Sequence, residues 1–150
     1  MITDTIVAIS TSIGEGAIGI VRLSGPEAFN IVDQFFKPFK KNNPVNRELV
    51  YGHIYNQELL VEEVMVVKMK APNTYTKENI VEINCHGGMI PLKEILGLAL
   101  NHGARMAERG EFTQRAFLNG RIDLAQAESV MDLISAKTKK GFDLALNQLE

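Results

Sequence analysis

The stretch IVEINCH, residues 80–86, alternates in the way that is typical of a β-strand. Successive side chains of a strand point to opposite faces, so Val81, Ile83 and Cys85 share one face. The other face carries Ile80, Glu82, Asn84 and His86. We therefore expect an apolar core on one side of this strand and a polar row on the other.

Working outward from this strand, the hydrophobic pattern predicts further strands and helices in mixed order. The other expected strands are 5–12, 18–25, 47–56, 60–70 and a short one at 104–107, with a hairpin turn at Asn56-Gln57 and a loop at 71–79. The expected helices are one that begins after Ser24 and ends near Pro38, one opened by Pro91 and closed by Gly103, one at 111–118, and one at 123–150. A hairpin together with this mixed order predicts an α+β fold with a mixed sheet rather than a strict βαβ series.

Two helix starts have a recognisable cap. Ser24 with Glu27 fits a capping box for the first helix, and Asp123 with Gln126 fits the start of the last one. The last helix carries apolar or small residues at three- and four-residue spacing up to its end, without a stop signal. We expect the natural chain to continue beyond this helix into a larger helical unit.

Composition narrows the class of protein. The chain has 150 residues, of which 45% are hydrophobic and 23% charged, as in ordinary globular proteins. Its net charge of −2 and the absence of a basic stripe argue against a main nucleic-acid grip on this chain, and the cluster Lys37, Lys40 and Lys41 is expected to be solvated. No stretch is long and apolar enough for a membrane span, no secretory signal precedes the first strand, and one cysteine suits a reducing cytoplasm.

Two sequence motifs could indicate a dinucleotide site or a cysteine nucleophile, but neither function is favoured. Gly14 to Gly19 match G-x-G-x-x-G, but a strand rather than a helix follows, so a glycine-rich turn is favoured over a dinucleotide site. Cys85 and His86 are neighbours on a strand and point apart, so a core thiol is favoured over a cysteine nucleophile. One cysteine and three scattered histidines offer no zinc spacing, so no metal site is expected.

The charged residues leave alternatives open. The polar row of Glu82, Asn84 and His86 fits an exposed face or a binding site, and the glycines that follow allow close approach of a ligand. Arg22 lies in an apolar strand register, so it reaches solvent or meets an anion. The charges around the short helix are expected to form a surface salt-bridge lattice of little energetic worth: Arg109, Glu111, Arg115, Arg121 and Asp123.

Three stretches resemble the N-terminal part of the MnmE (TrmE) family of tRNA-modification GTPases. They are DTIVAISTSIGEGAIGIVRLSG at 4–25, ENIVEINCHGG at 78–88 and RGEFTQRAFLNGRIDLAQAESVMDLISAKT at 109–138. The resemblance implies a tetrahydrofolate-binding and dimerisation domain at 1–118, similar to the folate-binding domains of one-carbon enzymes. It also implies that 119–150 begins a helical domain, cut off before the GTPase domain.

The resemblance also implies a function for the parent protein. With the flavoprotein partner MnmG (GidA), the family modifies carbon 5 of the wobble uridine of tRNA in the cytoplasm. The cofactors implied are 5,10-methylene- or 5-formyl-tetrahydrofolate and, in the full-length parent, GTP, Mg²⁺ and K⁺. The resemblance implies that this chain binds folate and forms a homodimer. Because G-x-x-x-x-G-K-[ST] is absent, we do not expect it to bind GTP in the P-loop manner, and we expect it to catalyse nothing alone. The alternative is a structural dimerisation module without a ligand.

The same resemblance carries three residues over as folate contacts: Arg22 of the I-V-R-L-S-G stretch, Glu82 of V-E-I-N, and Arg121 after F-L-N-G. A carboxylate such as Glu82 can accept two N–H groups from the amine edge of a pterin. Asn84 and His86 are expected to line the same pocket. This assignment requires that Glu82 lie near a cavity and that its carboxylate not be locked in an internal ion pair.

Overall fold

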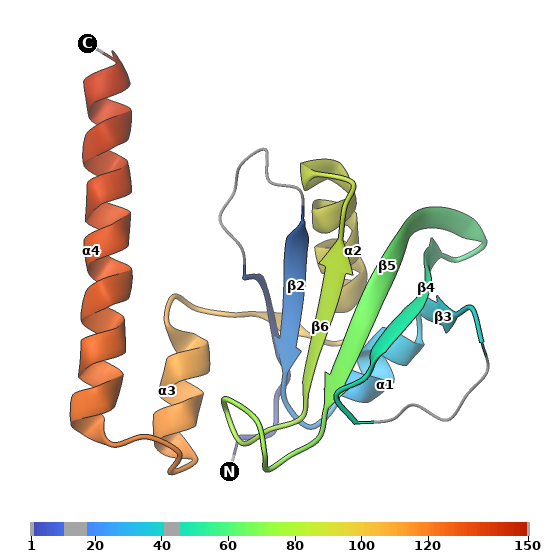
Figure 1. Ribbon diagram of the computed structural model, residues 1–150, viewed down its shortest axis with the longest axis horizontal. Helices are drawn as coiled ribbons and strands as arrows, with labels where there is room; N and C mark the ends of the chain where they lie inside the picture. The colour runs from blue at the N-terminus through green and yellow to red at the C-terminus, as the bar shows by residue number, and fades with distance from the viewer. Residues whose placement is uncertain (1, 11–17, 41–45, 150) are drawn as a thin grey trace.

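The computed structural model describes residues 2–10, 18–40 and 46–149 (Figure 1). The strands are β1 (Ile6–Ile9), β2 (Gly19–Ser24), β3 (Phe36–Pro38), β4 (Leu49–Asn56), β5 (Leu59–Met69), β6 (Ile80–Cys85) and β7 (Arg105–Met106). The helices are α1 (Ala28–Asp33), α2 (Met89–Asn101), α3 (Glu111–Leu118) and α4 (Leu124–Leu149). The glycine-rich loop expected at 14–19 lies mostly outside the described residues.

The strands form one mixed sheet in the order β3-β4-β5-β6-β2-β1-β7. All neighbouring pairs are antiparallel except β1 and β7, which are parallel. The α+β fold with a mixed sheet is therefore confirmed. The strand IVEINC lies inside the sheet, between β5 and β2, where both of its edges are hydrogen-bonded.

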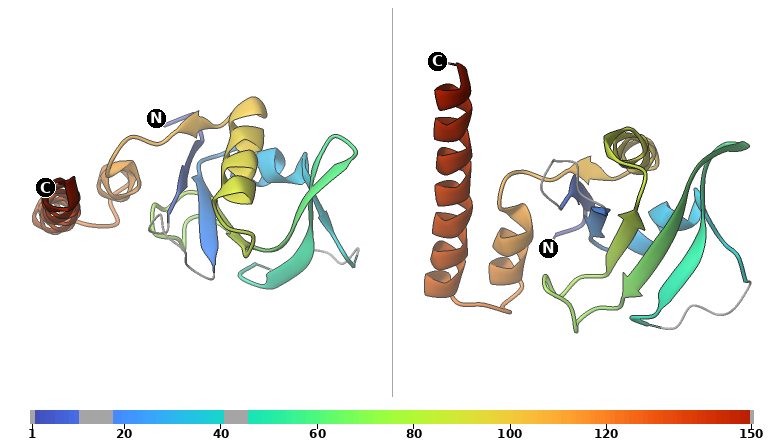
Figure 2. Two further views of the ribbon diagram at one scale, coloured as in Figure 1. Left: turned by 90° about the horizontal axis from the view of Figure 1, so that it is seen from above. Right: turned by 45° about the horizontal axis from the view of Figure 1, so that its top comes forward.

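Helices α1 and α2 cover one face of the sheet, and the core lies between them and the strands (Figure 2). Val81, Ile83 and Cys85 are fully buried there, as their alternation predicts. Helix α3 lies beside the β2 and β1 side of the sheet, and α4 runs along the outer side of α3 (Figure 1). No helix among the described residues is long and apolar enough to cross a membrane.

The first helix differs from its prediction at both ends. The capping box is wrong, because the Ser24 hydroxyl is paired with Thr76 (2.7 Å) and donates to Glu78 (2.8 Å) instead. The hydroxyl of Thr5 accepts the N–H of Glu27 at 2.9 Å and supports this end of α1. The helix also stops at Asp33, since the chain then adds β3 to the edge of the sheet, where a proline is tolerated.

Other elements lie close to their predicted positions. The hairpin between β4 and β5 turns at Gln57 and the residue after it, one position later than expected, and Gln57 takes the left-handed conformation with φ 58°. Helix α2 begins two residues before Pro91, and Gly103 follows its end with φ 109°. The short strand β7 and helix α3 are confirmed. The predicted domain boundary after residue 118 falls between α3 and α4 and stays a prediction.

The capping box of the last helix is confirmed in both directions. The backbone N–H of Gln126 donates to the Asp123 carboxylate at 2.8 Å, and the N–H of Asp123 donates to the Gln126 side chain at 2.9 Å. Two donors at the start of α4 are thereby satisfied within the local sequence.

Candidate functional site

Arg22 and Glu82 face one another across two neighbouring strands. They are direct partners in the register of β2 and β6, so their side chains lie on the same face of the sheet. The Nε and Nη2 atoms of Arg22 donate to Oε2 of Glu82 at 2.9 and 2.7 Å. The side chains of Arg22 and Glu82 are 33% and 24% exposed, so the pair is accessible from solvent.

This ion pair bears directly on the predicted folate contact. Arg22 occupies one carboxylate oxygen of Glu82, whereas Oε1 accepts no hydrogen bond from the described residues. A partly exposed ion pair contributes little net stability, on the order of 0–1 kcal/mol. The Glu82 carboxylate is therefore paired with Arg22 but still accessible to solvent. Replacing Arg22 by another hydrogen-bond donor should cost little free energy.

Two aromatic rings lie beside the arginines of the predicted site. The guanidinium of Arg22 lies over the Phe112 ring, 5.6 Å from its centroid, and that of Arg121 lies over the Tyr75 ring at 4.7 Å. The Tyr75 hydroxyl is hydrogen-bonded to the hydroxyl of Thr113 at 2.9 Å. Because Phe112 and Thr113 are consecutive on α3, both arginine–aromatic pairs contact this helix.

Sequence reasoning missed both rings. Phe112 and Thr113 stand within the EFTQR part of the family stretch, but nothing in their spacing indicates that they face β2. Tyr75 lies in the loop 71–79, which has no periodicity from which a direction could be inferred. Only the position of α3 against the sheet identifies them as site residues.

Asn84 and His86 are placed less closely. Asn84 shares the face of Glu82, is partly buried, and donates from Nδ2 to the backbone carbonyl of Met65 on β5 at 3.2 Å. His86 lies beyond the end of β6 and is exposed. Their role as pocket lining stays a prediction.

Cys85 lies on the opposite, core side of the same strand. Its side chain is fully buried, and burial raises the pKa of the thiol. A nucleophilic cysteine needs an accessible thiol with a lowered pKa. The site of Glu82 and the position of Cys85 are thus separated by the sheet itself.

Arg115 anchors α3 to the rest of the domain. The sequence predicts a surface lattice of charges around this helix, which is wrong for Arg115 and Glu111, since they are only 2% and 8% exposed. Arg115 donates from Nη1 to the Asp4 carbonyl at 2.8 Å and to Glu78 Oε2 at 3.1 Å. It also donates from Nη2 to the Asp4 carboxylate at 2.6 Å. Helix α3 packs Arg115 inward because Asp4, which precedes β1, and Glu78 of the 71–79 loop supply acceptors on that side.

Arg105 extends this cluster toward the surface. Its guanidinium donates from Nη1 and Nη2 to both carboxylate oxygens of Glu111, at 3.0 and 2.5 Å, and from Nε to Asp4 at 2.8 Å. The hydrogen bond from Arg105 lowers the pKa of Glu111 and that of Asp4, and Arg115 lowers both further. At neutral pH both carboxylates are therefore ionised, and their ion pairs with Arg105 and Arg115 hold α3 in place.

Two cavities lie on either side of α3. One of about 350 Å³ is lined by Ile2, Thr3, Asp4, Arg105, Glu111, Gln114, Arg115 and Leu118. The other, of about 460 Å³ between α3 and α4, is lined by Glu108, Arg109, Gly110, Thr113, Gln114, Phe117, Leu124, Ala127, Glu128, Met131 and Asp132. Neither is lined by Glu82, Arg22 or Arg121, so neither provides the cavity that the folate assignment requires beside Glu82. Within the described residues no group of three or more His, Cys, Asp or Glu side chains could hold a metal ion.

Comparison with known proteins gives a consistent result along the chain. Residues 5–121 match the family described as "GTP-binding protein TrmE N-terminus". The chain is 63% identical to a tRNA modification GTPase MnmE of Alkaliphilus oremlandii, over 99% of this chain and 33% of that protein. It is 57% identical to the protein of that name from Bacillus subtilis, over 98% of this chain and 33% of the relative. The chain thus spans about a third of the length of these curated relatives. On this match, the chain belongs to the TrmE N-terminal family.

Proposed function

We propose that this chain is the folate-binding and dimerising N-terminal domain of a tRNA-modification GTPase. Arg22, Glu82 and Arg121 are its ligand contacts, and a tetrahydrofolate derivative, 5,10-methylene- or 5-formyl-tetrahydrofolate, is its ligand. The observation that carries the proposal is the grouping of two arginine–aromatic pairs and one partly open carboxylate around α3.

The chemistry of this grouping fits a reduced pterin. Phe112 and Tyr75 offer apolar surface to a flat ring, and Arg22 and Arg121 supply cations to a ligand that ends in carboxylates. Oε1 of Glu82 accepts no hydrogen bond from the described part of the chain, so it can accept an N–H from the amine edge of the pterin.

The ion pair between Arg22 and Glu82 sets how the ligand enters. Two adjacent N–H groups of the pterin can take the place of the Arg22 guanidinium on the carboxylate. Arg22 is then released to donate to a carbonyl or carboxylate of the same ligand. Because each side chain keeps a hydrogen-bond partner after the exchange, and both are partly exposed to solvent, neither charge is left buried and unpaired.

The parent protein supplies the rest of the activity in this proposal. The relatives are named as tRNA modification GTPases. GTP, Mg²⁺ and K⁺ would bind outside this chain, where the remaining two thirds of the relatives' length lies. MnmG and tRNA would be partners of the whole cytoplasmic protein, which modifies carbon 5 of the wobble uridine, and this chain alone would be non-catalytic.

A structural dimerisation module is the second candidate. Two observations favour it: the Glu82 carboxylate already has a partner in Arg22, and the two cavities beside α3 do not reach Glu82. In that case the chain self-associates and its ligand contacts are incomplete.

Calorimetric titration with 5-formyltetrahydrofolate separates the two candidates. The folate proposal predicts saturable binding that Glu82→Gln weakens by at least about tenfold, because a charge-assisted hydrogen bond contributes about 1.5–3 kcal/mol. Glu94→Gln, an exposed glutamate on α2, is the matched control and should bind normally. Sedimentation that shows a dimer, combined with no saturable heat at high micromolar ligand, would support the structural module instead.

A further inference from the structure

The sheet face that carries Glu82 is not covered by α1 or α2. Directly paired residues on neighbouring strands share a face, which places Tyr51, Met65 and Asn84 in one row across β4, β5 and β6. His53 on β4 pairs with Lys37 on β3, so these two lie on the same face. In Figure 1 the uncovered side of the sheet is turned toward the viewer, and α1 and α2 lie behind the strands.

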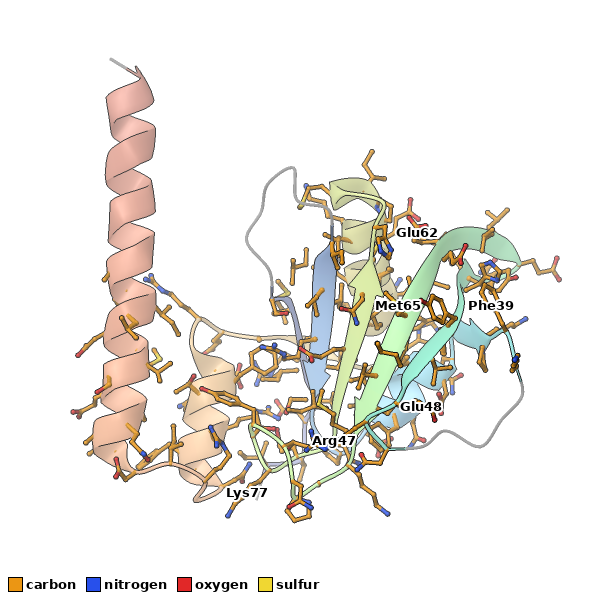
Figure 3. The ribbon with its side chains drawn as sticks, viewed as in Figure 1. Phe39, Arg47, Glu48, Glu62, Met65 and Lys77 are labelled. Carbon is orange, nitrogen blue, oxygen red and sulfur yellow. The ribbon has the colours of Figure 1, made fainter. Side chains whose placement is uncertain are left out.

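Aromatic and basic side chains gather at the β3 and β4 part of this face. The Phe39 ring packs edge-on against His53, with centroids 4.5 Å apart, and His53 contacts Tyr55 at 6.0 Å. Lys37 Nζ lies 5.0 Å from the centroid of the Tyr55 ring. Phe39 and Tyr51 are 51% and 56% exposed, although both are large apolar rings. Figure 3 labels Phe39 near the β3 edge of the sheet and Met65 nearer its middle, on β5.

We propose that this aromatic cluster, Phe39, Tyr51, His53 and Tyr55 with Lys37 and Lys40, binds unpaired bases of an RNA loop. This inference rests on the proposed function, which makes tRNA the substrate. Exposed aromatic rings on a sheet are the usual platform for single-stranded RNA, since bases that are not paired can stack on them. The rings of Phe39 and Tyr51 would take the bases.

The charges around the cluster give the strand an orientation. Lys37 and Lys40 are exposed on the β3 side and attract phosphates. Glu63 is exposed on the β5 side of the cluster, on the same face as His53, with which it pairs in the register of β4 and β5. A carboxylate repels phosphate but accepts hydrogen bonds from base amines. The backbone of the RNA is therefore expected along the β3 edge, with its bases directed toward β5.

The cluster also lies close enough to the proposed folate contacts for neighbouring nucleotides of one RNA loop to reach both. Two strand spacings of about 4.8 Å each separate β4 from β6, or about 10 Å in total. One nucleotide stacked on Tyr51 would bring a neighbouring nucleotide close to Glu82 and Arg22, on the same face. The net charge of −2 leaves the main RNA grip to the rest of the parent and gives this cluster the task of orienting the loop.

Fluorescence anisotropy with a labelled anticodon stem–loop RNA tests the inference on this chain. Phe39→Ala should weaken binding about tenfold, and Lys37→Gln should lower the slope of log affinity against log salt by about 0.7. Ile90→Ala and Lys93→Gln on α2, which lies on the other side of the sheet, are matched controls and should bind as the unchanged chain does. The stem duplex without its loop should compete poorly, since its bases are paired.

Three results would overturn the inference: no saturable binding, equal affinity of Phe39→Ala and the unchanged chain, or equal competition by the duplex. A second copy of this chain would be the occupant if Phe39→Ala abolished self-association in sedimentation and left RNA binding intact. Folate titration of the same variants keeps the two proposals apart. If the unchanged chain binds folate but not RNA, only this inference is contradicted. If it binds RNA but not folate, only the folate assignment is contradicted.

Discussion

Arg115 on α3 donates two hydrogen bonds to Asp4 near the start of the chain. Its Nη1 donates to the backbone carbonyl at 2.8 Å, and its Nη2 donates to the carboxylate at 2.6 Å. The two residues are 111 positions apart in the sequence. Through Arg115, the helix that carries Phe112 and Thr113 is fixed to Asp4, two residues before β1 begins, and to Glu78 of the 71–79 loop. The stability of the domain and the geometry of the proposed ligand site therefore share one anchor.

Replacing Arg115 should destabilise the domain strongly. Arg115→Met keeps much of the side-chain volume but leaves Glu78 and Glu111, both largely buried, without this cation. Removal of one partner from a buried ion pair costs about 3–5 kcal/mol. Urea unfolding should show this loss, whereas Arg109→Met, at an exposed arginine next to the same helix, should change the free energy of unfolding by less than about 0.5 kcal/mol. Similar effects of both substitutions would mean that Arg115 is not an anchor.

Arg22 should matter for ligand binding much more than for stability. The ion pair with Glu82 is partly exposed, so Arg22→Gln is expected to change the free energy of unfolding by no more than about 1 kcal/mol. The same substitution should weaken 5-formyltetrahydrofolate binding about tenfold, because it removes a charged donor. Calorimetry and urea unfolding of one preparation measure both quantities, with Arg47→Gln as the exposed control. Tighter binding by Arg22→Gln would show that Arg22 merely competes with the ligand for Glu82.

The domain should lose stability in acid through Glu111. The hydrogen bond from Arg105 lowers the pKa of Glu111 in the folded state, so the unfolded chain binds protons more readily. The stabilisation is present above the unfolded pKa of about 4.3 and is lost as the pH falls through the lower folded value. Urea unfolding at neutral pH and in the acid range should therefore show a weaker pH dependence for Glu111→Gln than for the unchanged chain. Glu94→Gln, on an exposed position, should keep the full dependence, and an unchanged slope in Glu111→Gln would exclude Glu111 as the source.

Cys85 should react with thiol reagents only when the chain opens. It is fully buried, and burial raises the pKa of its thiol, so little thiolate is accessible at neutral pH. Labelling with a chromogenic disulfide should be slow in buffer and fast in denaturing urea. Ser129→Cys places a second thiol on an exposed position of α4 and should react quickly under the same conditions. Rapid labelling of Cys85 in the native chain would revive the interpretation of this residue as a nucleophile.

The sequence alone determined those features whose cause is local. Alternation in IVEINC fixed which side chains enter the core, since the period of a strand is a property of its own backbone. Asp123 and Gln126 determined the start of α4 because the cap closes within four residues. The same local logic misassigned Ser24, whose hydroxyl turned instead to Thr76 and Glu78, more than fifty positions along the chain.

Tertiary structure decided everything that depends on register and on the packing of distant segments. Arg22 and Glu82 are each foreseeable as polar residues on strands, but only the antiparallel pairing of β2 with β6 sets them opposite one another. Arg115 lies on a helix whose sequence predicts surface charges, and it is buried because Asp4, just before the first strand, and Glu78 of the 71–79 loop bring carboxylates to it. An unpaired charge is costly to bury and a well-paired one is tolerated, so the burial of such a residue is set by its distant partners and not by its own neighbours in the chain.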